Sequence, residues 1–400
     1  MAEKAVSPVR PSILPGWLWI ALPIAALIAL VAVFVLSNPA AVFTSAAPPL
    51  EDLAVQRIAV TETGFRVEVF NNGATEVTIA QVAVDDAFWQ FSAEPSATLP
   101  RLGQATLTIP YPWVAGEPHA IALVTNTGTT FEGEVVAATL TPAPGPREFG
   151  AYALLGIYVG IIPVALGMLW FPAMRRMGRR GLNAVLALTV GLLIFLLVDT
   201  GFEILELGAE APSVFQGVPL ALFAALLTWL ALLAVGNRRR ERDPDPARQR
   251  LYIATLIALG IGLHNLGEGL AIGAAFALGE AALGSFLVLG FTLHNVTEGV
   301  GIVAPVTRDQ PKLATLIGLT LLAGAPAILG AWIGGFAFSP VLAVLFLGIG
   351  LGSIWQVIVE VGQLMRRDAE RDGAPLVTWL NVGALLAGIA IMYLTALLVK

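Results

Sequence analysis

The chain contains no cysteine, which excludes disulfide bonds, thiolate metal sites and cysteine nucleophiles. Charged residues are also scarce: they make up 12% of the 400 residues, whereas 57% are hydrophobic and fall in many long apolar runs. Soluble globular proteins do not have this composition, so the sequence predicts a polytopic α-helical membrane protein. Histidine occurs three times, and two of the three lie in apolar runs long enough to cross a bilayer.

Those two histidines begin the two copies of a His-Asn-x-x-Glu-Gly motif, at His264 and His294. In each copy the His and the Glu are four residues apart, which places them on one face of a helix, with the Asn about 100° further round. If the two helices pack antiparallel, as the short link near residue 280 indicates, one imidazole and one carboxylate from each can converge. We therefore predict a metal site at membrane depth, with these ligands: His264, Glu268, His294 and Glu298, and Asn265 and Asn295 as amide ligands of a second ion.

Imidazole nitrogens with carboxylate oxygens form a borderline ligand set. The set suits Zn²⁺, which we expect first, and also Fe²⁺, Mn²⁺, Co²⁺, Ni²⁺ and Cd²⁺. A single intramembrane His-Glu pair could instead form a structural hydrogen bond between helices, or a proton relay without metal. The repetition of the same residues in register favours the metal site.

The paired motifs resemble the fourth and fifth transmembrane helices of the ZIP (Zrt/Irt-like) divalent metal transporters, above all the bacterial branch, in which both copies read HN-x-P-EG. The resemblance covers about residues 148–400. It implies a transporter that moves divalent metal into the cytoplasm through a binuclear site. It also implies roles for the motif residues: His264, Glu268, His294 and Glu298 match the first-metal ligands, and Asn265 and Asn295 match the second site together with the shared glutamates.

The chain departs from this family pattern at two places. The residue before each motif glutamate is commonly proline in those relatives, but here it is Gly267 or Thr297. The sixth helix of the family often carries a glutamate before a proline, and the comparable stretch here has Ala325 before Pro326. The second ion therefore lacks one of the carboxylates that the family provides.

We predict three parts: 1–44, an N-terminal tail and transmembrane helix; 45–147, an extracytoplasmic β-sandwich; and 148–400, an eight-helix ZIP-like transport domain. The apolar run Trp17–Leu36 favours a retained helix, because it is longer than a usual signal-peptide core. A cleaved signal peptide with a cut site at Ser45–Ala47 is the alternative. Both interpretations send the following residues outside.

Short β-branched runs separated by turn signals predict about seven strands in the second part, without the Cys pair of a true immunoglobulin domain. His119, Glu117 and the pair Asp85-Asp86 are candidates for attracting metal near the entrance, although surface loops carry such residues routinely. A proline-rich linker, 141–146, ends this part.

Eight apolar segments follow, at about 149–172, 182–207, 214–236, 251–279, 282–306, 313–336, 340–364 and 375–399. The loops after the first, third, fifth and seventh segments hold Arg or Lys, and the loops between them hold none. By the positive-inside rule the basic loops are cytoplasmic. The prediction is a multi-pass protein of the cell membrane with the sandwich and Lys400 outside.

Four further polar residues lie within apolar segments and are predicted to line a transport pathway. Asp199 and Glu203 share one helix face with Glu206 toward the outer end of the second segment. Gln356 and Glu360 are likewise four residues apart in the seventh segment. In the family that the chain resembles, Glu360 matches a recurrent carboxylate.

Three classes of function compete. A metal transporter explains the repeated motif and the charge-sorted loops. An intramembrane metal hydrolase would use Glu268 or Glu298 as general base, but the sequence has no HExxH motif. A receptor or adhesion protein would place the function in the sandwich and keep the bundle as an anchor, which leaves the repeated ligand set without a role. A metal-dependent receptor or sensor stays an alternative. We predict a transporter and not an enzyme. The expected partners are membrane lipid and divalent metal ions, together with a second copy of the chain in a homodimer, and no nucleic acid is expected to bind.

Overall fold

The computed structural model describes residues 16–37, 50–240 and 245–397. The chain divides into two compact units, Met1–Leu50 and Glu51–Lys400. The first unit contains helix α1 (Gly16–Ser37), an apolar helix of 22 residues. The alternative cut site at 45–47 lies outside the described residues.

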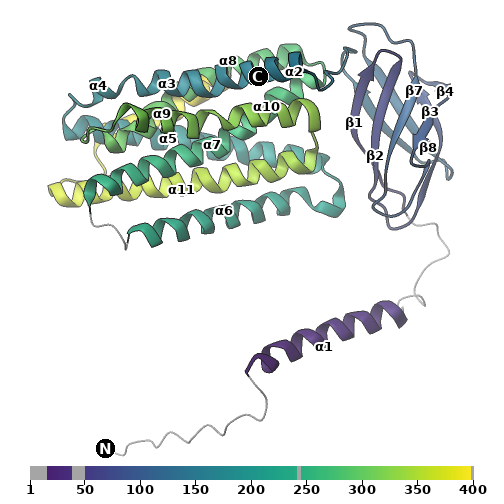
Figure 1. Cartoon of the computed structure of the whole chain (residues 1–400), viewed down its shortest axis with the longest axis horizontal. Helices are drawn as coiled ribbons and strands as arrows, with labels where there is room; N and C mark the ends of the chain where they lie inside the picture. The colour runs from purple at the N-terminus through teal and green to yellow at the C-terminus, as the bar shows by residue number, and fades with distance from the viewer. Residues whose placement is uncertain (1–15, 38–49, 241–244, 398–400) are drawn as a thin grey trace, which may run out of the picture. The chain divides into compact units, whose positions relative to one another are not determined.

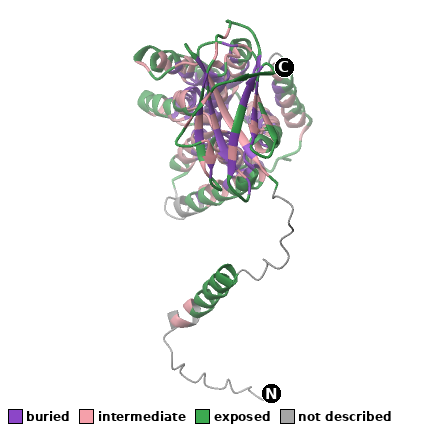
Figure 2. Cartoon of the chain, turned by 90° about the vertical axis from the view of Figure 1, so that its right-hand side faces the viewer, coloured by how far each residue is buried: buried purple, intermediate pink, exposed green. Residues whose placement is uncertain are grey.

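The second unit begins with two antiparallel sheets. Their strand orders are β1-β2-β7-β5 and β4-β3-β8-β9, with β6 paired to β3. Buried and exposed residues alternate along the strands, as the colouring in Figure 2 shows, and in one strand Ala105, Leu107 and Ile109 face the core. The strands are β1 (Leu53–Thr61), β2 (Gly64–Asn71), β3 (Val77–Val84), β4 (Ala87–Trp89), β5 (Ser92–Glu94), β6 (Thr98–Leu99), β7 (Gln104–Pro110), β8 (His119–Thr125) and β9 (Thr130–Val135).

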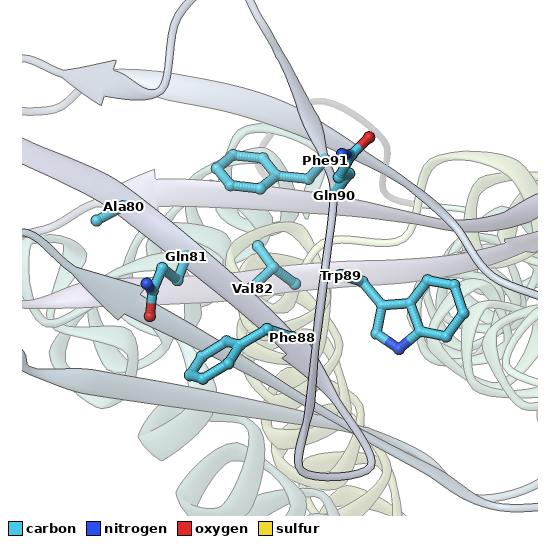
Figure 3. Close-up of a pocket in the computed structure, with 7 residues that line it drawn as sticks. All are labelled: Ala80, Gln81, Val82, Phe88, Trp89, Gln90 and Phe91. Atoms are coloured by element: carbon cyan, nitrogen blue, oxygen red, sulfur yellow. The ribbon is translucent and has the colours of Figure 1, made fainter.

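The described residues thus contain nine strands where the sequence predicted about seven. The additional strands are short, with two or three residues each, and too brief for a period-two pattern to appear. A groove of about 430 Å³ on this domain is lined by three aromatic side chains, Phe88, Trp89 and Phe91, and by the amides of Gln81 and Gln90 (Figure 3). Its lining has no ionisable side chain, so the groove offers a metal ion no charged ligand.

His119 and Asp85 do meet in the sandwich. The His119 Nδ1 lies 2.7 Å from Asp85 Oδ2, and the Tyr111 hydroxyl donates to the same oxygen at 2.8 Å. The Ala120 N–H donates to the other oxygen at 3.0 Å. Within the part of the chain that the structure describes, no third His, Cys, Asp or Glu completes a ligand set here. The pair is therefore explained as a structural hydrogen-bond cluster.

This cluster predicts a pH-dependent stability of the sandwich. Burial acts to raise the pKa of Asp85, but hydrogen bonds from His119, Ala120 and Tyr111 outweigh it and lower the pKa below its ordinary value. A carboxylate with a lowered folded-state pKa stabilises the fold above its unfolded pKa, and this contribution is lost as the pH falls through the folded value. We expect Asp85→Asn to lower the melting temperature at pH 7 by a few degrees and to weaken its decline in acid.

The matched control for this prediction is Asp86→Asn. Both positions have positive φ, 50° at Asp85 and 64° at Asp86, a conformation that Asn tolerates well. Backbone strain therefore cannot distinguish the two variants. Thermal melting of the full chain from pH 7 to pH 3, followed by circular dichroism, gives the measurement. Equal melting curves for the two variants would show that the Asp85 hydrogen bonds do not stabilise the domain.

Eight helices among the described residues are long and apolar enough to cross a membrane, and they lie side by side (Figure 1). The predicted fold class, a polytopic helical protein with a β domain, is thereby confirmed. The first span consists of α2 (Pro146–Gly156), a π-helical turn (Ile157–Ile161), α3 (Ile162–Met168) and α4 (Phe171–Met174). The second to fifth spans are α5 (Arg179–Glu210), α6 (Gly217–Arg240), α7 (Pro246–Ala277) and α8 (Ala281–Val303). The sixth span consists of α9 (Leu313–Gly324) and α10 (Pro326–Ala337), and the last two are α11 (Pro340–Asp372) and α12 (Trp379–Ala396).

Two spans are irregular, and each irregularity lies at a proline. The first span contains the π-helical turn just before Pro163, and the sixth span is divided at Ala325, just before Pro326. Proline lacks a backbone N–H and its ring crowds the preceding turn, so interruptions are expected there. Helices α7 and α8, by contrast, continue without a break through Gly267 and Thr297, where the ZIP relatives commonly have proline.

Candidate metal centre

The centre lies between α7 and α8, the two helices that carry the repeated motif. All four of its predicted first-metal ligands are buried, with exposed fractions between 4% and 8%. The His294 Nε2 lies 2.5 Å from Glu268 Oε1, and the His264 Nε2 lies 3.3 Å from the same oxygen. The ligand atoms of these three residues all lie within 4.8 Å of one another. One carboxylate oxygen therefore stands between two imidazoles from different helices.

Glu298 is the predicted ligand that this group of three does not include. Its side chain is buried, and neither carboxylate oxygen has a hydrogen-bond partner among the residues that the structure describes. The i, i+4 spacing places Glu298 on the same face of α8 as His294, and of these two side chains His294 is the one that pairs with Glu268.

The two motif asparagines are fully buried beside the cluster. The Asn295 Nδ2 donates to Glu268 Oε2 at 2.9 Å and to the Val159 carbonyl oxygen at 3.1 Å. The Asn265 Nδ2 donates to the Ala323 carbonyl oxygen at 3.1 Å. The carbonyl partners belong to the first and sixth spans, so four segments of the bundle meet at the centre.

Several buried acceptor atoms at the centre have no hydrogen-bond partner within the described ranges. They are the Oδ1 atoms of Asn265 and Asn295 and both oxygens of Glu298. Buried polar atoms are nearly always satisfied, and an unpaired buried carboxylate is costly. A divalent cation would satisfy nitrogen and oxygen acceptors of this kind together.

The predicted pathway residues lie on opposite sides of this centre. On α5, Glu203 is half-buried and interacts electrostatically with His264, Glu268 and Asp199. Glu206, less than one turn further on, is exposed. The acidic face of α5 therefore leads from an exposed carboxylate to the neighbourhood of the motif histidine.

Gln356 and Glu360 lie on α11, which passes beside the centre at Gly350: a Cβ at Gly350 would stand 3.6 Å from the His264 Cα. Both residues are 1% exposed, and the Gln356 Nε2 donates to Glu360 Oε1 at 3.0 Å. A Cβ at Gly236, near the end of α6, would lie 3.6 Å from Glu360 Oε1. At 1.5 Å of rise per residue, Gln356 and Glu360 lie roughly 9 and 15 Å along α11 from the centre, so they are outside the cluster.

The fold and the cluster together define a class: a polytopic α-helical membrane protein with a His/Glu/Asn centre between two spans. No protein-family model matches the chain. The chain is similar to the zinc transporter ZIPB of Bordetella bronchiseptica, at 28% identity over 148 residues, which are 34% of this chain and 47% of that protein. The chain thus spans about half the length of this curated relative. The similarity and the eight apolar helices together support the ZIP family for this chain, in agreement with the motif resemblance.

Proposed function

We propose that this protein carries divalent transition metal ions, zinc first, across the cell membrane into the cytoplasm through the centre between α7 and α8. The observation that carries the proposal is the group of buried nitrogen and oxygen acceptors around Glu268, several of them without a hydrogen-bond partner in the described chain. Such a group is costly in a protein that only needs to be stable. The similarity to a protein named as a zinc transporter supports the same function.

The proposed path follows the buried polar residues. The ion approaches along the acidic face of α5, past Asp199 and Glu203, and exchanges water for the ligands of the centre. It then leaves past Gln356 and Glu360, on the side where α6 ends and α7 begins. The basic residues of that side predict that it is cytoplasmic.

Release requires that the ligands hold the ion only in one arrangement of the helices. The His264 imidazole approaches Glu268 along α7, whereas His294 reaches it from α8. A shift of α7 relative to α8 would therefore separate the imidazoles and weaken the binding of the ion. Coordination needs the unprotonated imidazoles and carboxylates, so protons compete with the metal and influx should depend on pH.

The test is metal influx into liposomes that contain the purified full chain, with Zn²⁺, Fe²⁺, Mn²⁺ and Cd²⁺ offered separately. We expect influx of Zn²⁺ and a loss of about tenfold or more in His264→Ala, because a ligand should matter at least as much as the groups that orient it. The matched control is His119→Gln, since His119 is the third histidine and lies in the sandwich. We expect His119→Gln to keep the wild-type rate.

Two outcomes of this assay would contradict the proposal. Equal influx in wild type and His264→Ala would show that the ion does not pass through this centre. Binding of Zn²⁺ at equilibrium without influx of any ion would favour a receptor, a sensor or a metal-dependent hydrolase. A Glu203→Gln variant in the same assay tests the path, and we expect its influx to fall most at low metal concentration.

A further inference from the structure

The closest contacts in the bundle are made through glycine, and they divide the spans into two groups. A Cβ at Gly160, Gly167 or Gly269 would stand closer than 3.0 Å to backbone atoms of a neighbouring helix, and these contacts join the first, fourth, fifth and sixth spans. Contacts of the same kind at Gly191 and Gly348 join the second span to the eighth and the seventh to the third. A shared hydrophobic cluster joins these two pairs into the second group.

Contacts between the two groups run through side chains instead. A Cβ at Gly260 would meet the Val357 side chain first, and one at Gly301 would meet the Thr189 side chain. The metal centre lies between α7 and α8 and belongs to the first group. The four predicted pathway residues lie on α5 and α11 and belong to the second group: Asp199, Glu203, Gln356 and Glu360. In the proposed transport the ion therefore passes between the groups.

The β-sandwich is attached to the first group. Both belong to one compact unit, Glu51–Lys400, and the proline-rich linker leads from the sandwich directly into α2. The Arg57 guanidinium donates to the Phe336 carbonyl oxygen in the last turn of α10 at 2.9 Å, where a cation also meets the negative end of the helix dipole. A Cβ at Gly279, between α7 and α8, would stand 2.5 Å from the Thr139 hydroxyl oxygen.

A cluster of polar side chains also attaches the sandwich to the second group, at the link between α5 and α6. The Asn72 amide uses both of its ends there. Its Nδ2 donates to Ser213 Oγ at 2.5 Å, and its Oδ1 accepts from the Val214 N–H at 2.8 Å. Asp52 Oδ2 accepts from Asn72 Nδ2 at 2.5 Å and from Ser213 Oγ at 3.3 Å. We call these four residues the latch.

The latch lies in solvent, at the end of the helix that carries the predicted entry residues. The link residues Ser213 and Val214 are exposed and follow closely after Glu210, where α5 ends. Next to them the Phe70 and Phe215 rings lie 5.7 Å apart. Water competes for exposed hydrogen bonds, so each contributes little net stability. The latch can therefore open without disturbing the core of either domain.

We propose that the β-sandwich is a releasable strap across this end of the bundle. It is fixed to the spans that hold the metal centre, and through the latch it grips the spans that hold the path. While the latch is closed, the two groups cannot shift against each other, and ion exchange at the centre requires that it open. The proposal rests on the proposed function in that the ion moves between the groups.

The absence of cysteine from the chain makes a direct test possible. Asn72→Cys together with Ser213→Cys places two thiols where the side chains already touch, and oxidation then locks the latch. We expect oxidation of this pair to reduce Zn²⁺ influx into liposomes by about tenfold or more, because a disulfide holds more strongly than the exposed hydrogen bonds that it replaces. Reduction should restore the influx.

The matched control is Thr78→Cys together with Thr98→Cys. The two hydroxyl oxygens lie 2.9 Å apart, and both residues belong to the sandwich, so this disulfide does not join the sandwich to the bundle. We expect its oxidation to leave influx unchanged. Counting free thiols shows that each pair has closed. A 72/213 pair that does not oxidise would overturn the proposal, since the sandwich would then not lie against the link.

Opening the latch should have the opposite effect. Asn72→Ala removes the side-chain bonds to Ser213 and Val214, and we expect influx to rise by about two- to tenfold. Asn126→Ala, at an exposed position in the turn after β8, is the control and should keep the wild-type rate. Equilibrium Zn²⁺ binding should be the same in Asn72→Ala, in the oxidised pair and in the wild type, because the latch contains no ligand of the centre.

Equal influx before and after oxidation of the 72/213 pair would overturn the proposal, and so would slower influx in Asn72→Ala, since the sandwich would then support transport. Wild-type protein that binds Zn²⁺ without transporting it would refute the proposed function. The strap is then judged by the rate at which a chelator removes Zn²⁺ from the full chain in detergent. Slower removal after oxidation supports the strap, and equal rates overturn it. Wild-type protein that binds no Zn²⁺ would refute both proposals.

Discussion

Replacing Glu268 by glutamine is expected to abolish metal influx. Glu268 contacts both motif histidines through Oε1 and accepts from Asn295 through Oε2. Glutamine keeps the size of the side chain, but it replaces one oxygen by an NH₂ group and removes the charge that compensates the cation. Loss of an outer-shell group typically costs 10–100-fold in metal affinity, so loss of this central ligand should reduce influx by about 100-fold or more.

The control for this variant is Glu280→Gln. Glu280 is the residue before α8, and its side chain makes no capping hydrogen bond there. Both substitutions remove one negative charge from the α7–α8 pair, so a difference between them isolates the centre. Influx and equilibrium Zn²⁺ binding should be measured together, with melting temperature as a check on the fold. Influx at the wild-type rate in Glu268→Gln would exclude the centre as the transport site.

The sequence predicted the part of the centre that depends on helical periodicity. The i, i+4 spacing of His and Glu, read twice, predicted that His264, Glu268 and His294 would meet between two helices, and the structure brings them together. The reason is physical: once a segment is known to be helical, four residues fix a common face. The roles of these residues in transport stay predictions for the experiments above.

Periodicity could not predict which of the two glutamates lies between the histidines. That choice depends on the rotation of α7 and α8 about their own axes and on the rotamers of the side chains. The pairing of Asn295 with Val159 was equally beyond prediction, because the two residues are 136 positions apart. The proline at 163 signalled an irregular turn in the first span, but not which side chain would use the carbonyls of that turn.

The domain boundaries and the orientation remain predictions of a different kind. The basic loops predict the cytoplasmic side from charge alone. The β domain shows how much depends on strand length: long alternating runs such as β7 (Gln104–Pro110) are plain in the sequence, whereas β6 (Thr98–Leu99) is defined only by its partner strand.

The position of Glu268 depends in turn on the glycine beside it. Helices α7 and α10 pack through small residues on both sides, as a Cβ at Gly269 would stand 2.1 Å from the Ala327 carbonyl oxygen and one at Gly330 would stand 2.0 Å from the Leu266 carbonyl oxygen. Such contacts let transmembrane backbones approach closely. The Ala323 carbonyl, which accepts from Asn265, lies at the end of α9, three residues before α10 begins. The contact between α7 and α10 therefore also bears on the end of α9.

Gly269→Ala is therefore expected to damage both stability and metal binding. The added methyl group meets backbone atoms, which cannot move aside as a flexible side chain can, so the helices must separate. Overpacking of this kind costs about 1–3 kcal/mol or more. We expect a lower melting temperature and, because Glu268 shifts with α7, a loss of Zn²⁺ affinity.

The matched control is Gly318→Ala in α9, where an added Cβ has no atom within 4 Å. Both substitutions raise helix propensity equally, so only the contact with α10 distinguishes them. Gly318→Ala should melt at or above the wild-type temperature and bind Zn²⁺ unchanged. If Gly269→Ala behaved in the same way, the α7–α10 contact would be looser than the structure shows, and the centre would not depend on it for the placement of Glu268.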